Sequence, residues 1–274
     1  MTDDQPSTSA VDTSTPSIAR TYDACLGGKD NFEVDRQVLR QILEVMPDFN
    51  AMADENRDWL IRVVRFLARD AGIDQFLDVG SGLPTRENTH QAAQRINPEA
   101  TVVYVDNDPA CVAFGQALLE QNARTRFASA DLTEPDELLA HPRVADHLDF
   151  RRPIGLIQCS TAHHIPDERH PAQIMAAYRR AMPSGSYLAL AQTFDPEDGG
   201  YYTDLARGIE RTFRDTGFGT VRYRSRDRIQ EYFGDWEMVE PGLTLISQWW
   251  PDGPRYRSAS DADQLMLGGV ARKP

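Results

Sequence analysis

A short glycine-rich turn carries the clearest sign of ligand binding in this sequence. The apolar run Phe76–Val79 leads into Gly80-Ser81-Gly82, and glycines in such a turn let a ligand approach the backbone closely. Two later apolar runs each end in an acidic residue, Asp106 and Asp131. A carboxylate at the first of these positions can accept both hydroxyls of a ribose, and the second could reach an adenine amino group. The pattern favours a ligand that contains a nucleoside.

Two kinds of ligand compete for this turn, a dinucleotide and S-adenosylmethionine. The dinucleotide fingerprint needs a third glycine for close helix packing, whereas Thr85 stands there, directly after Pro84. Asp78 beside the turn suits an ammonium group better than a pyrophosphate. The residues therefore favour S-adenosylmethionine as the cofactor and disfavour a nicotinamide-dependent oxidoreductase. A purely structural turn is the remaining alternative, because Gly-x-Gly turns are common.

Two adjacent histidines follow the fourth expected strand, where an acceptor pocket usually opens in this architecture. A histidine with an ordinary pKa of about 6.5 can act as a general base, so His163 and His164 are the candidate catalytic residues. The alternative is that one packs inward while the other caps a helix or binds a backbone carbonyl. Together with Asp167 and His170 they lie in one loop without convincing ligand spacing. We therefore predict no metal site.

The elements that must position these residues alternate between strand and helix from Gln75 onward. Such alternation predicts right-handed βαβ units and a parallel sheet covered on both faces. The expected strands are 75–79, 101–105, 125–130, 154–160 and 187–192, and the expected helices are 86–96, 109–121, 134–140, 171–182 and 201–216. Strand-like segments at 236–239, 243–249 and 265–271 lack a convincing helix among them, so an antiparallel pair should finish the sheet. The fold class is α/β and doubly wound.

A helical pattern of about fifty residues precedes the first strand. Apolar residues recur at three- and four-residue spacing in 33–46 and again from residue 54 to 67, as in amphipathic helices. We therefore divide the chain into a disordered Ser/Thr-rich tail (1–15), a helical N-terminal lid segment (16–72) and a cofactor-binding domain (73–274).

The polar stretch 22–32 joins two parts of the lid segment. Gly27-Gly28 within it suits a loop better than a helix interior, which favours a loop that lines the site. We expect Tyr22 to stack on the cofactor or hydrogen bond to it, and Lys29 or Asn31 to meet a carboxylate. The alternative is a glycine hinge that only joins two helices. Asn56 and Arg57, which open the next helix, can reach the same cleft.

The sequence resembles the class I S-adenosylmethionine-dependent methyltransferases, in particular the S-adenosyl methyltransferase family that was long catalogued as a domain of unknown function. The resemblance extends over roughly residues 17–273, and the matching segments are 22–32, 76–85, 103–109, 130–132, 162–166, 183–187, 239–243 and 269–273. It implies a Rossmann-like, seven-stranded, mostly parallel sheet whose last strand is antiparallel, with an N-terminal helical extension.

The resemblance also implies roles for individual residues. By motif position, Asp78, Gly80 and Gly82 hold the methionyl end of the cofactor. Asp106 then binds the ribose and Asp131 the adenine. The predicted cofactor site is completed by Ser81, Asn107, Leu132, Tyr22 and Lys29.

Composition narrows the partners and the compartment. The 274 residues include 29 basic and 42 acidic ones, for a net charge of −13, which argues against a general nucleic-acid or membrane binder. Three widely spaced cysteines, the lack of a membrane-length apolar run and the lack of a signal-peptide pattern favour the reducing cytoplasm. We predict a cytoplasmic methyltransferase with a small-molecule acceptor. The alternative is a non-catalytic S-adenosylmethionine-binding regulatory protein, and the sequence predicts no oligomeric state.

Overall fold

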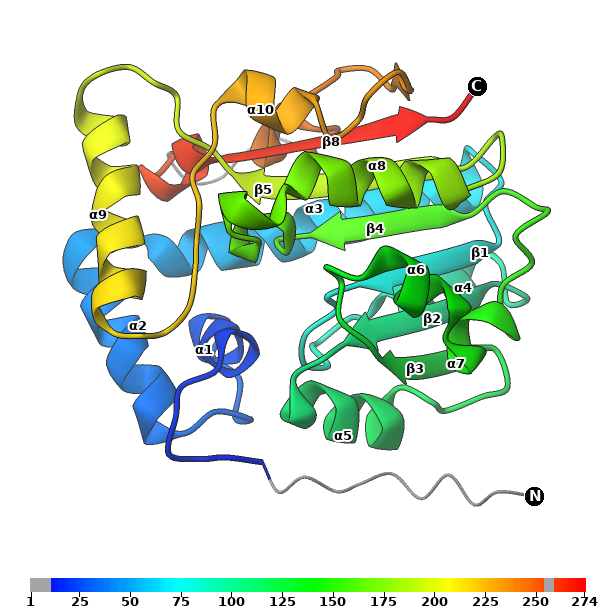
Figure 1. Cartoon of the computed structure of the whole chain (residues 1–274), viewed down its shortest axis with the longest axis horizontal. Helices are drawn as coiled ribbons and strands as arrows, with labels where there is room; N and C mark the ends of the chain where they lie inside the picture. The colour runs from blue at the N-terminus through cyan, green and yellow to red at the C-terminus, as the bar shows by residue number, and fades with distance from the viewer. Residues whose placement is uncertain (1–10, 254–258) are drawn as a thin grey trace.

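A twisted sheet with helices on both faces organises the chain (Figure 1). The computed structural model describes residues 11–253 and 259–274. The strands are β1 (Gln75–Val79), β2 (Thr101–Asp106), β3 (Thr125–Ser129), β4 (Gly155–Cys159), β5 (Tyr187–Thr193), β6 (Glu237–Met238), β7 (Thr244–Leu245) and β8 (Met266–Arg272). Their order is β3-β2-β1-β4-β5-β8-β6, with β7 also paired to β8. Neighbours among β1–β5 are parallel, whereas β8 runs antiparallel to β5.

The α/β, doubly wound class is confirmed, and the end of the sheet differs in detail from the expected seven strands. The described residues form eight strands, because β6 and β7 pair separately along β8. Each is only two residues long, and the turn at Pro241-Gly242 lies between them. The rest of the expected strand 243–249 is a short 3₁₀ helix, Ile246–Gln248.

The helices cover the two faces of the sheet in separate sets. They are α1 (Ile18–Cys25), α2 (Glu33–Val45), α3 (Phe49–Arg69), α4 (Thr89–Ile96), α5 (Pro109–Leu118), α6 (Pro135–Ala140), α7 (Pro142–Ala145), α8 (Pro171–Ala181), α9 (Tyr201–Asp215) and α10 (Arg226–Gln230). Successive strand residues point to opposite faces. Phe76 therefore joins the core under α3, α4 and α5, and Leu77 joins the core under α6, α7, α8 and α10.

Helices α1 and α2, the first turns of α3, and α9 stand across the carboxyl ends of the parallel strands, while the rest of α3 runs along one face of the sheet (Figure 1). In Figure 1 the arrowheads of β3 and β4 point toward this group, whereas β8 points away from it. Helix α9 approaches α2 closely, because a Cβ added at Gly208 would lie 2.8 Å from Val45 Cγ1. This packing builds a wall opposite the strand ends, where the ligand of an open α/β sheet is expected to bind.

Two expected boundaries differ from the structure. Helix α4 begins at Thr89 instead of residue 86, because the backbone N–H of Asn88 donates a 2.8 Å hydrogen bond to Gln91 Oε1 and fixes the helix start there. Most of the expected disordered tail, residues 1–10, lies outside the described residues. Residues 11–15 are described, and Val11 packs against the main core. In the described ranges, no helix combines the length and the apolar character needed to cross a membrane.

Candidate functional site

A cavity of about 500 Å³ opens at the carboxyl ends of the strands, under the wall formed by α1, α2, α3 and α9. Its volume falls within the range of small-molecule sites. The sequence-predicted residues that line it are Asp78, Gly80, Ser81, Gly82, Asp106, Asn107, Leu132, Tyr22, Asn56, Arg57, His163 and His164. Segments far apart in the sequence therefore meet in one place.

The glycine turn has the backbone conformation that its residues suggest. Gly80 and Gly82 have φ angles of +74° and +68°, which side chains other than glycine rarely adopt. A Cβ at Gly80 would lie 2.2 Å from Thr161 Cγ2, so the loop after β4 also requires glycine there. The backbone N–H of Gly80 donates to Val105 O at 2.7 Å, which fixes the turn against the end of β2.

Asp106 lies directly beside this turn, at the end of β2. Its carboxylate accepts hydrogen bonds from the backbone N–H groups of Gly82 and Asp108, both at 2.9 Å. Burial raises the pKa of Asp106, while these two hydrogen bonds oppose the increase. Each carboxylate oxygen has two lone pairs, so Asp106 keeps the capacity to accept hydrogen bonds from ribose hydroxyls.

Asp78 and Arg57 supply opposite charges at the inner end of the turn. Asp78 Oδ2 accepts a 2.6 Å hydrogen bond from Thr89 Oγ1, and burial raises the pKa of Asp78 to about 6. Arg57 lines the cavity and donates to the carbonyl of Glu87. No ion pair joins Arg57 to a carboxylate in the described part of the chain. The two side chains suit the ammonium and the carboxylate of an amino acid.

Tyr22 connects the first helix to the floor of the cavity. Its hydroxyl donates to Ala53 O at 3.1 Å and accepts from Asn56 Nδ2 at 2.8 Å, and the Cys159 thiol donates to Asn56 Oδ1 at 3.2 Å. Burial raises the pKa of Cys159 to about 12, so this thiol stays neutral near pH 7 and is a poor nucleophile. The network therefore joins α1, α3 and β4 without an ionised group.

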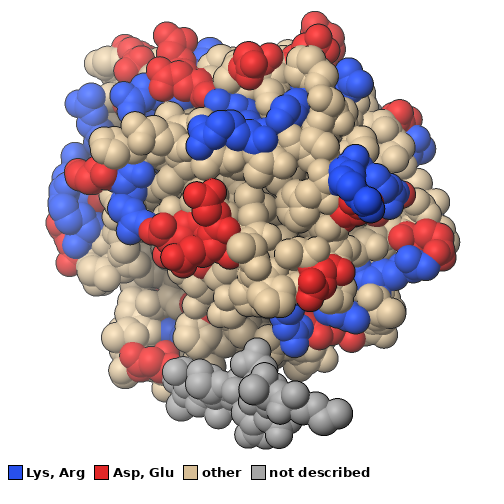
Figure 2. Space-filling view, turned by 45° about the vertical axis from the view of Figure 1, so that its right-hand side comes forward, with Lys and Arg blue, Asp and Glu red and all other residues tan. Residues whose placement is uncertain are grey.

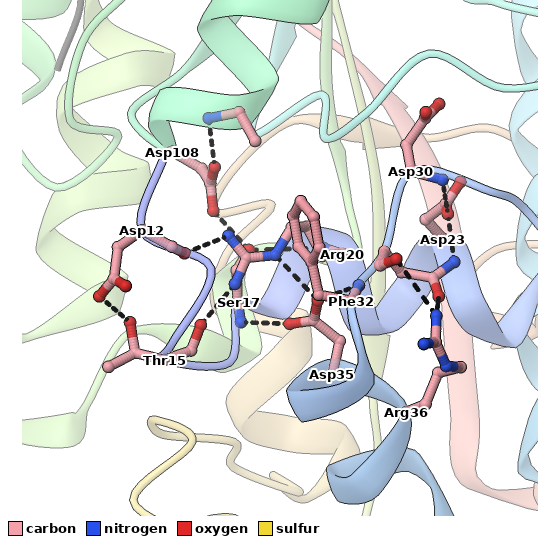
Figure 3. A network of polar contacts seen from close by, with 12 residues as sticks. Asp12, Thr15, Ser17, Arg20, Asp23, Asp30, Phe32, Asp35, Arg36 and Asp108 are labelled. Carbon is pink, nitrogen blue, oxygen red and sulfur yellow. Dashed lines mark hydrogen bonds and ion pairs between the residues drawn. The ribbon is translucent and has the colours of Figure 1, made fainter. Parts of the chain in front are cut away.

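The segment before α1 is fastened across the rim of the cavity by Arg20 (Figure 3). Its guanidinium forms a buried ion pair with Asp35 at 2.9 Å and donates to the carbonyls of Asp12 and Thr15. Ser17 Oγ also donates to the carboxylate of Asp108, two residues after Asp106. The N-terminal segment is thus joined to the loop that follows Asp106, the residue predicted to bind the ribose.

His164 is held in one orientation and one tautomer. Its Nδ1 lies 2.7 Å from the carbonyl oxygen of Thr220, and since a carbonyl only accepts, Nδ1 carries the proton and Nε2 keeps a lone pair. The ring stacks on Phe213 with centroids 6.2 Å apart. Burial lowers the pKa of His164 to about 4. The residue is a neutral hydrogen-bond acceptor at the cavity wall.

His163 lies deeper than its neighbour. Its Nδ1 accepts a long, 3.4 Å hydrogen bond from the Thr193 backbone N–H, and burial lowers its pKa well below the usual value. Asp167 pairs with Arg224 at 2.9 Å, and His170 is exposed. No group of three or more His, Cys, Asp or Glu side chains is arranged for a metal ion within the described ranges.

Three buried hydroxyl groups of the cavity wall have no hydrogen-bond partner in the described part of the chain. They are Thr21 Oγ1, Ser81 Oγ and Tyr223 OH. Buried polar atoms without partners are rare in folded proteins.

The comparisons with known proteins agree with this geometry. Residues 4–274 match the sequence profile of the S-adenosyl methyltransferase family. The chain belongs to this family. It is an S-adenosylmethionine-dependent methyltransferase, and S-adenosylmethionine is its cofactor.

Two crystal structures of this methyltransferase fold are similar to the chain over almost their whole length. A protein from Thermobifida fusca YX, provisionally described as a methyltransferase, is 41% identical with a TM-score of 0.89, and the match covers 96% of this chain and 97% of that one. A DUF574 family protein from Streptomyces avermitilis MA-4680 is 36% identical with a TM-score of 0.90, and the match covers 97% and 100%. No curated protein matches the sequence.

Two of the predicted cofactor residues lie outside the cavity. Asp131 is exposed, and its carboxylate accepts hydrogen bonds from the backbone and the hydroxyl of Thr133, both at 2.8 Å. Its neighbours Ala130 and Leu132 line the cavity instead. Lys29 is also exposed and does not contribute to the described lining.

Sequence patterns did not indicate the part of the cavity that comes from α9 and the loop after it. Phe213, Phe218 and Tyr223 line the cavity, but apolar residues on an amphipathic helix are usually core residues, so their pattern gave no signal. The Arg20–Asp35 pair was also missed, since fifteen residues separate them and no motif joins them. Asp108 lies in the matching segment 103–109, but nothing in the sequence indicated its contact with Ser17.

Proposed function

We propose that this methyltransferase acts on a small-molecule acceptor that binds beside the cofactor in the cavity. The observation that carries the proposal is the enclosure of the cavity by α1, α2, α3 and α9, with polar groups at the glycine turn and apolar side chains near α9. A space of about 500 Å³ under four helices suits a small molecule better than a polymer.

The charge distribution and the cysteines support the same proposal. On the face drawn in Figure 2, acidic and basic side chains are interspersed without the broad basic surface that nucleic-acid binding requires. Cys25, Cys111 and Cys159 are all free thiols, as in proteins of reducing compartments. We keep the cytoplasm as the expected compartment.

The residues in and around the glycine turn are assigned to cofactor binding. Asp78 pairs with its ammonium, Arg57 with its carboxylate, and Asp106 accepts its ribose hydroxyls, while Gly82 leaves room for close approach. When bound, S-adenosylmethionine supplies a methyl group on a positively charged sulfur, and in-line alignment of the acceptor is the main requirement for transfer.

His164 is assigned to the acceptor. Its Nε2 lone pair accepts the acceptor's proton, and the Thr220 carbonyl holds the ring so that Nε2 is the basic atom. His163 supports the ring of His164, whose centroid lies 4.3 Å away. Because both rings are neutral near pH 7, they add no positive charge beside the cofactor's sulfonium.

The N-terminal segment is assigned the role of a lid. Residues 12–25 line one side of the cavity, and Arg20 and Ser17 fasten them to Asp35 and Asp108. Release of these contacts would open a path for the cofactor, and their formation would exclude water. We keep the division into a tail (1–15), a helical lid segment (16–72) and a cofactor-binding domain (73–274) as part of this proposal.

Labelled methyl transfer tests the proposal. The purified protein is incubated with S-adenosylmethionine carrying a labelled methyl group and with a desalted or complete cell extract. We expect label in the small-molecule fraction only with the complete extract. Label that precipitates with protein or nucleic acid would contradict the proposal.

A further inference from the structure

The half of the cavity remote from the glycine turn has an aromatic and apolar wall. It is lined by Ile42, Ile209, Phe213, Phe218, Val221 and Tyr223. The Phe213 and Phe218 rings lie with centroids 4.7 Å apart. The loop after α9 is fixed against the histidine segment, because the backbone N–H of Arg222 donates to His163 O at 2.9 Å. The wall therefore forms a preformed surface for a flat apolar group.

The charged side chains that line the cavity are engaged away from this wall. Arg20 pairs with the buried Asp35, Asp108 accepts from Ser17, and Asp12 accepts from Ser14 and Thr15. The other charged groups in the described lining are Asp78, Asp106 and Arg57 at the glycine turn. A cation or an anion placed against the aromatic wall would lose its hydration without gaining a partner of opposite charge.

A polar atom interrupts the apolar half. His164 Nε2 is a hydrogen-bond acceptor, because Nδ1 is committed as a donor to Thr220. This nitrogen can accept a hydrogen bond from one hydroxyl group of a ligand.

We propose that this half of the cavity binds an uncharged aromatic acceptor with a phenolic hydroxyl, which donates its proton to His164 Nε2. The proposal rests on the proposed function and names the class of its acceptor. Aromatic rings pack favourably in offset or edge arrangements against aromatic walls. A phenol has a pKa of about 10, as in tyrosine, and so it loses its proton to a weak base more readily than an aliphatic alcohol does.

The step balances with these residues alone and the cofactor. The hydroxyl proton moves to His164 Nε2, an oxygen lone pair forms the bond to the methyl carbon, and the carbon–sulfur bond breaks with its electron pair left on sulfur. The products are an aryl methyl ether, S-adenosylhomocysteine and a protonated His164. Because burial disfavours the imidazolium, the proton leaves to water when the cavity opens.

Binding of matched probes to the protein saturated with S-adenosylhomocysteine tests this proposal by calorimetry. The probes are 2-naphthol, naphthalene and naphthalene-2-carboxylate, which share one aromatic core. We expect 2-naphthol to bind at least about tenfold more tightly than either of the others, the effect of one good hydrogen bond in a buried site.

The variant His164→Asn removes Nε2 and keeps a nitrogen donor near the Thr220 carbonyl. We expect it to weaken 2-naphthol binding about tenfold, to the level of naphthalene. His170→Asn is the matched control, since His170 is exposed and its left-handed backbone suits asparagine.

The two proposals fail in different ways. If the carboxylate probe binds as tightly as 2-naphthol, or if His164→Asn binds 2-naphthol as the unchanged protein does, the acceptor class is wrong. If S-adenosylhomocysteine itself does not bind, the assignment of the glycine turn fails first. Normal S-adenosylhomocysteine binding by each variant shows that the variant is folded.

Discussion

The backbone N–H of Gly82 donates a 2.9 Å hydrogen bond to Asp106 Oδ2. This bond joins the glycine turn after β1 to the acidic end of β2, so each of the two sequence motifs positions the other. The turn leaves open space beside Gly82, where no atom lies within 4 Å of an added Cβ. The cofactor assignment follows from this shared geometry and gives predictions for single side chains.

Asp106→Asn should weaken both S-adenosylhomocysteine and 5′-methylthioadenosine about tenfold. Both ligands contain the ribose, and the amide accepts fewer hydrogen bonds than the charged carboxylate does. Calorimetric titration measures the two affinities. Asp131→Asn is the control, because Asp131 is exposed outside the cavity, and we expect less than about a twofold effect. If Asp131→Asn weakens both ligands as much as Asp106→Asn does, the result would instead favour the adenine role that the resemblance implies for Asp131.

Arg57→Met should weaken the binding of the amino-acid end of the cofactor without affecting the binding of its nucleoside end. It removes the partner of the amino-acid carboxylate, so S-adenosylhomocysteine should bind about tenfold more weakly or worse. 5′-Methylthioadenosine lacks that carboxylate and should bind unchanged. Lys29→Met removes an exposed lysine outside the cavity and should affect neither ligand. Loss of 5′-methylthioadenosine binding by Arg57→Met would show that Arg57 supports the fold of the site instead.

Asp78 should make cofactor binding depend on pH. Its pKa is about 6 in the free protein because the carboxyl group is buried, and only the ionised form pairs with an ammonium group. Affinity for S-adenosylhomocysteine should therefore be level between pH 6.5 and 7 and fall as the pH decreases through about 6. Calorimetry in buffers of different ionisation enthalpy should detect proton release on binding.

Asp78→Asn is the comparison for this pH effect. The amide does not titrate, so its affinity should be lower near pH 7 and flat between pH 5 and 7. 5′-Methylthioadenosine, which has no ammonium group, should show no such dependence with the unchanged protein. A pH dependence that persists in Asp78→Asn would assign the titration to another group.

The buried ion pair of Arg20 and Asp35 should stabilise the folded protein and hold the lid in place. The two side chains are 4% and 0% exposed, and removal of one charge leaves the other buried without its partner. Asp35→Asn should lower the free energy of unfolding by about 3 kcal/mol, which denaturant titration measures. Glu33→Gln breaks an exposed contact of the same helix and should change it by less than about 1 kcal/mol. Similar values for both variants would argue against a structural role for the pair.

The sheet was largely predictable because local patterns encode it. Five buried runs alternate with amphipathic segments, and the observed β1, α5, α8 and α9 begin at the expected residues. The start of α4 was missed because it depends on a side-chain contact between Asn88 and the next helical turn. The length of β7 was overestimated, because only two residues of the expected strand 243–249 pair with β8.

The site was predictable where a motif carries it and unpredictable where distant segments meet. Gly80, Gly82 and Asp106 line the cavity as expected. The tautomer of His164 depends on the carbonyl of Thr220, 56 residues later, and no local pattern reports such a contact. The exposure of Lys29 likewise depends on how the loop at Gly27 turns after α1.

The thermal midpoint of the purified protein with added ligand tests the central claim most directly. S-Adenosylhomocysteine and NAD are each added at about 100 times a plausible dissociation constant, where a ligand specific for the native state adds about 2.7 kcal/mol. We predict an increase of about 5 °C or more with S-adenosylhomocysteine, no change with NAD, and a smaller increase for Asp106→Asn. An unchanged midpoint with S-adenosylhomocysteine, or an increase with NAD alone, would contradict the assignment of the glycine turn to S-adenosylmethionine.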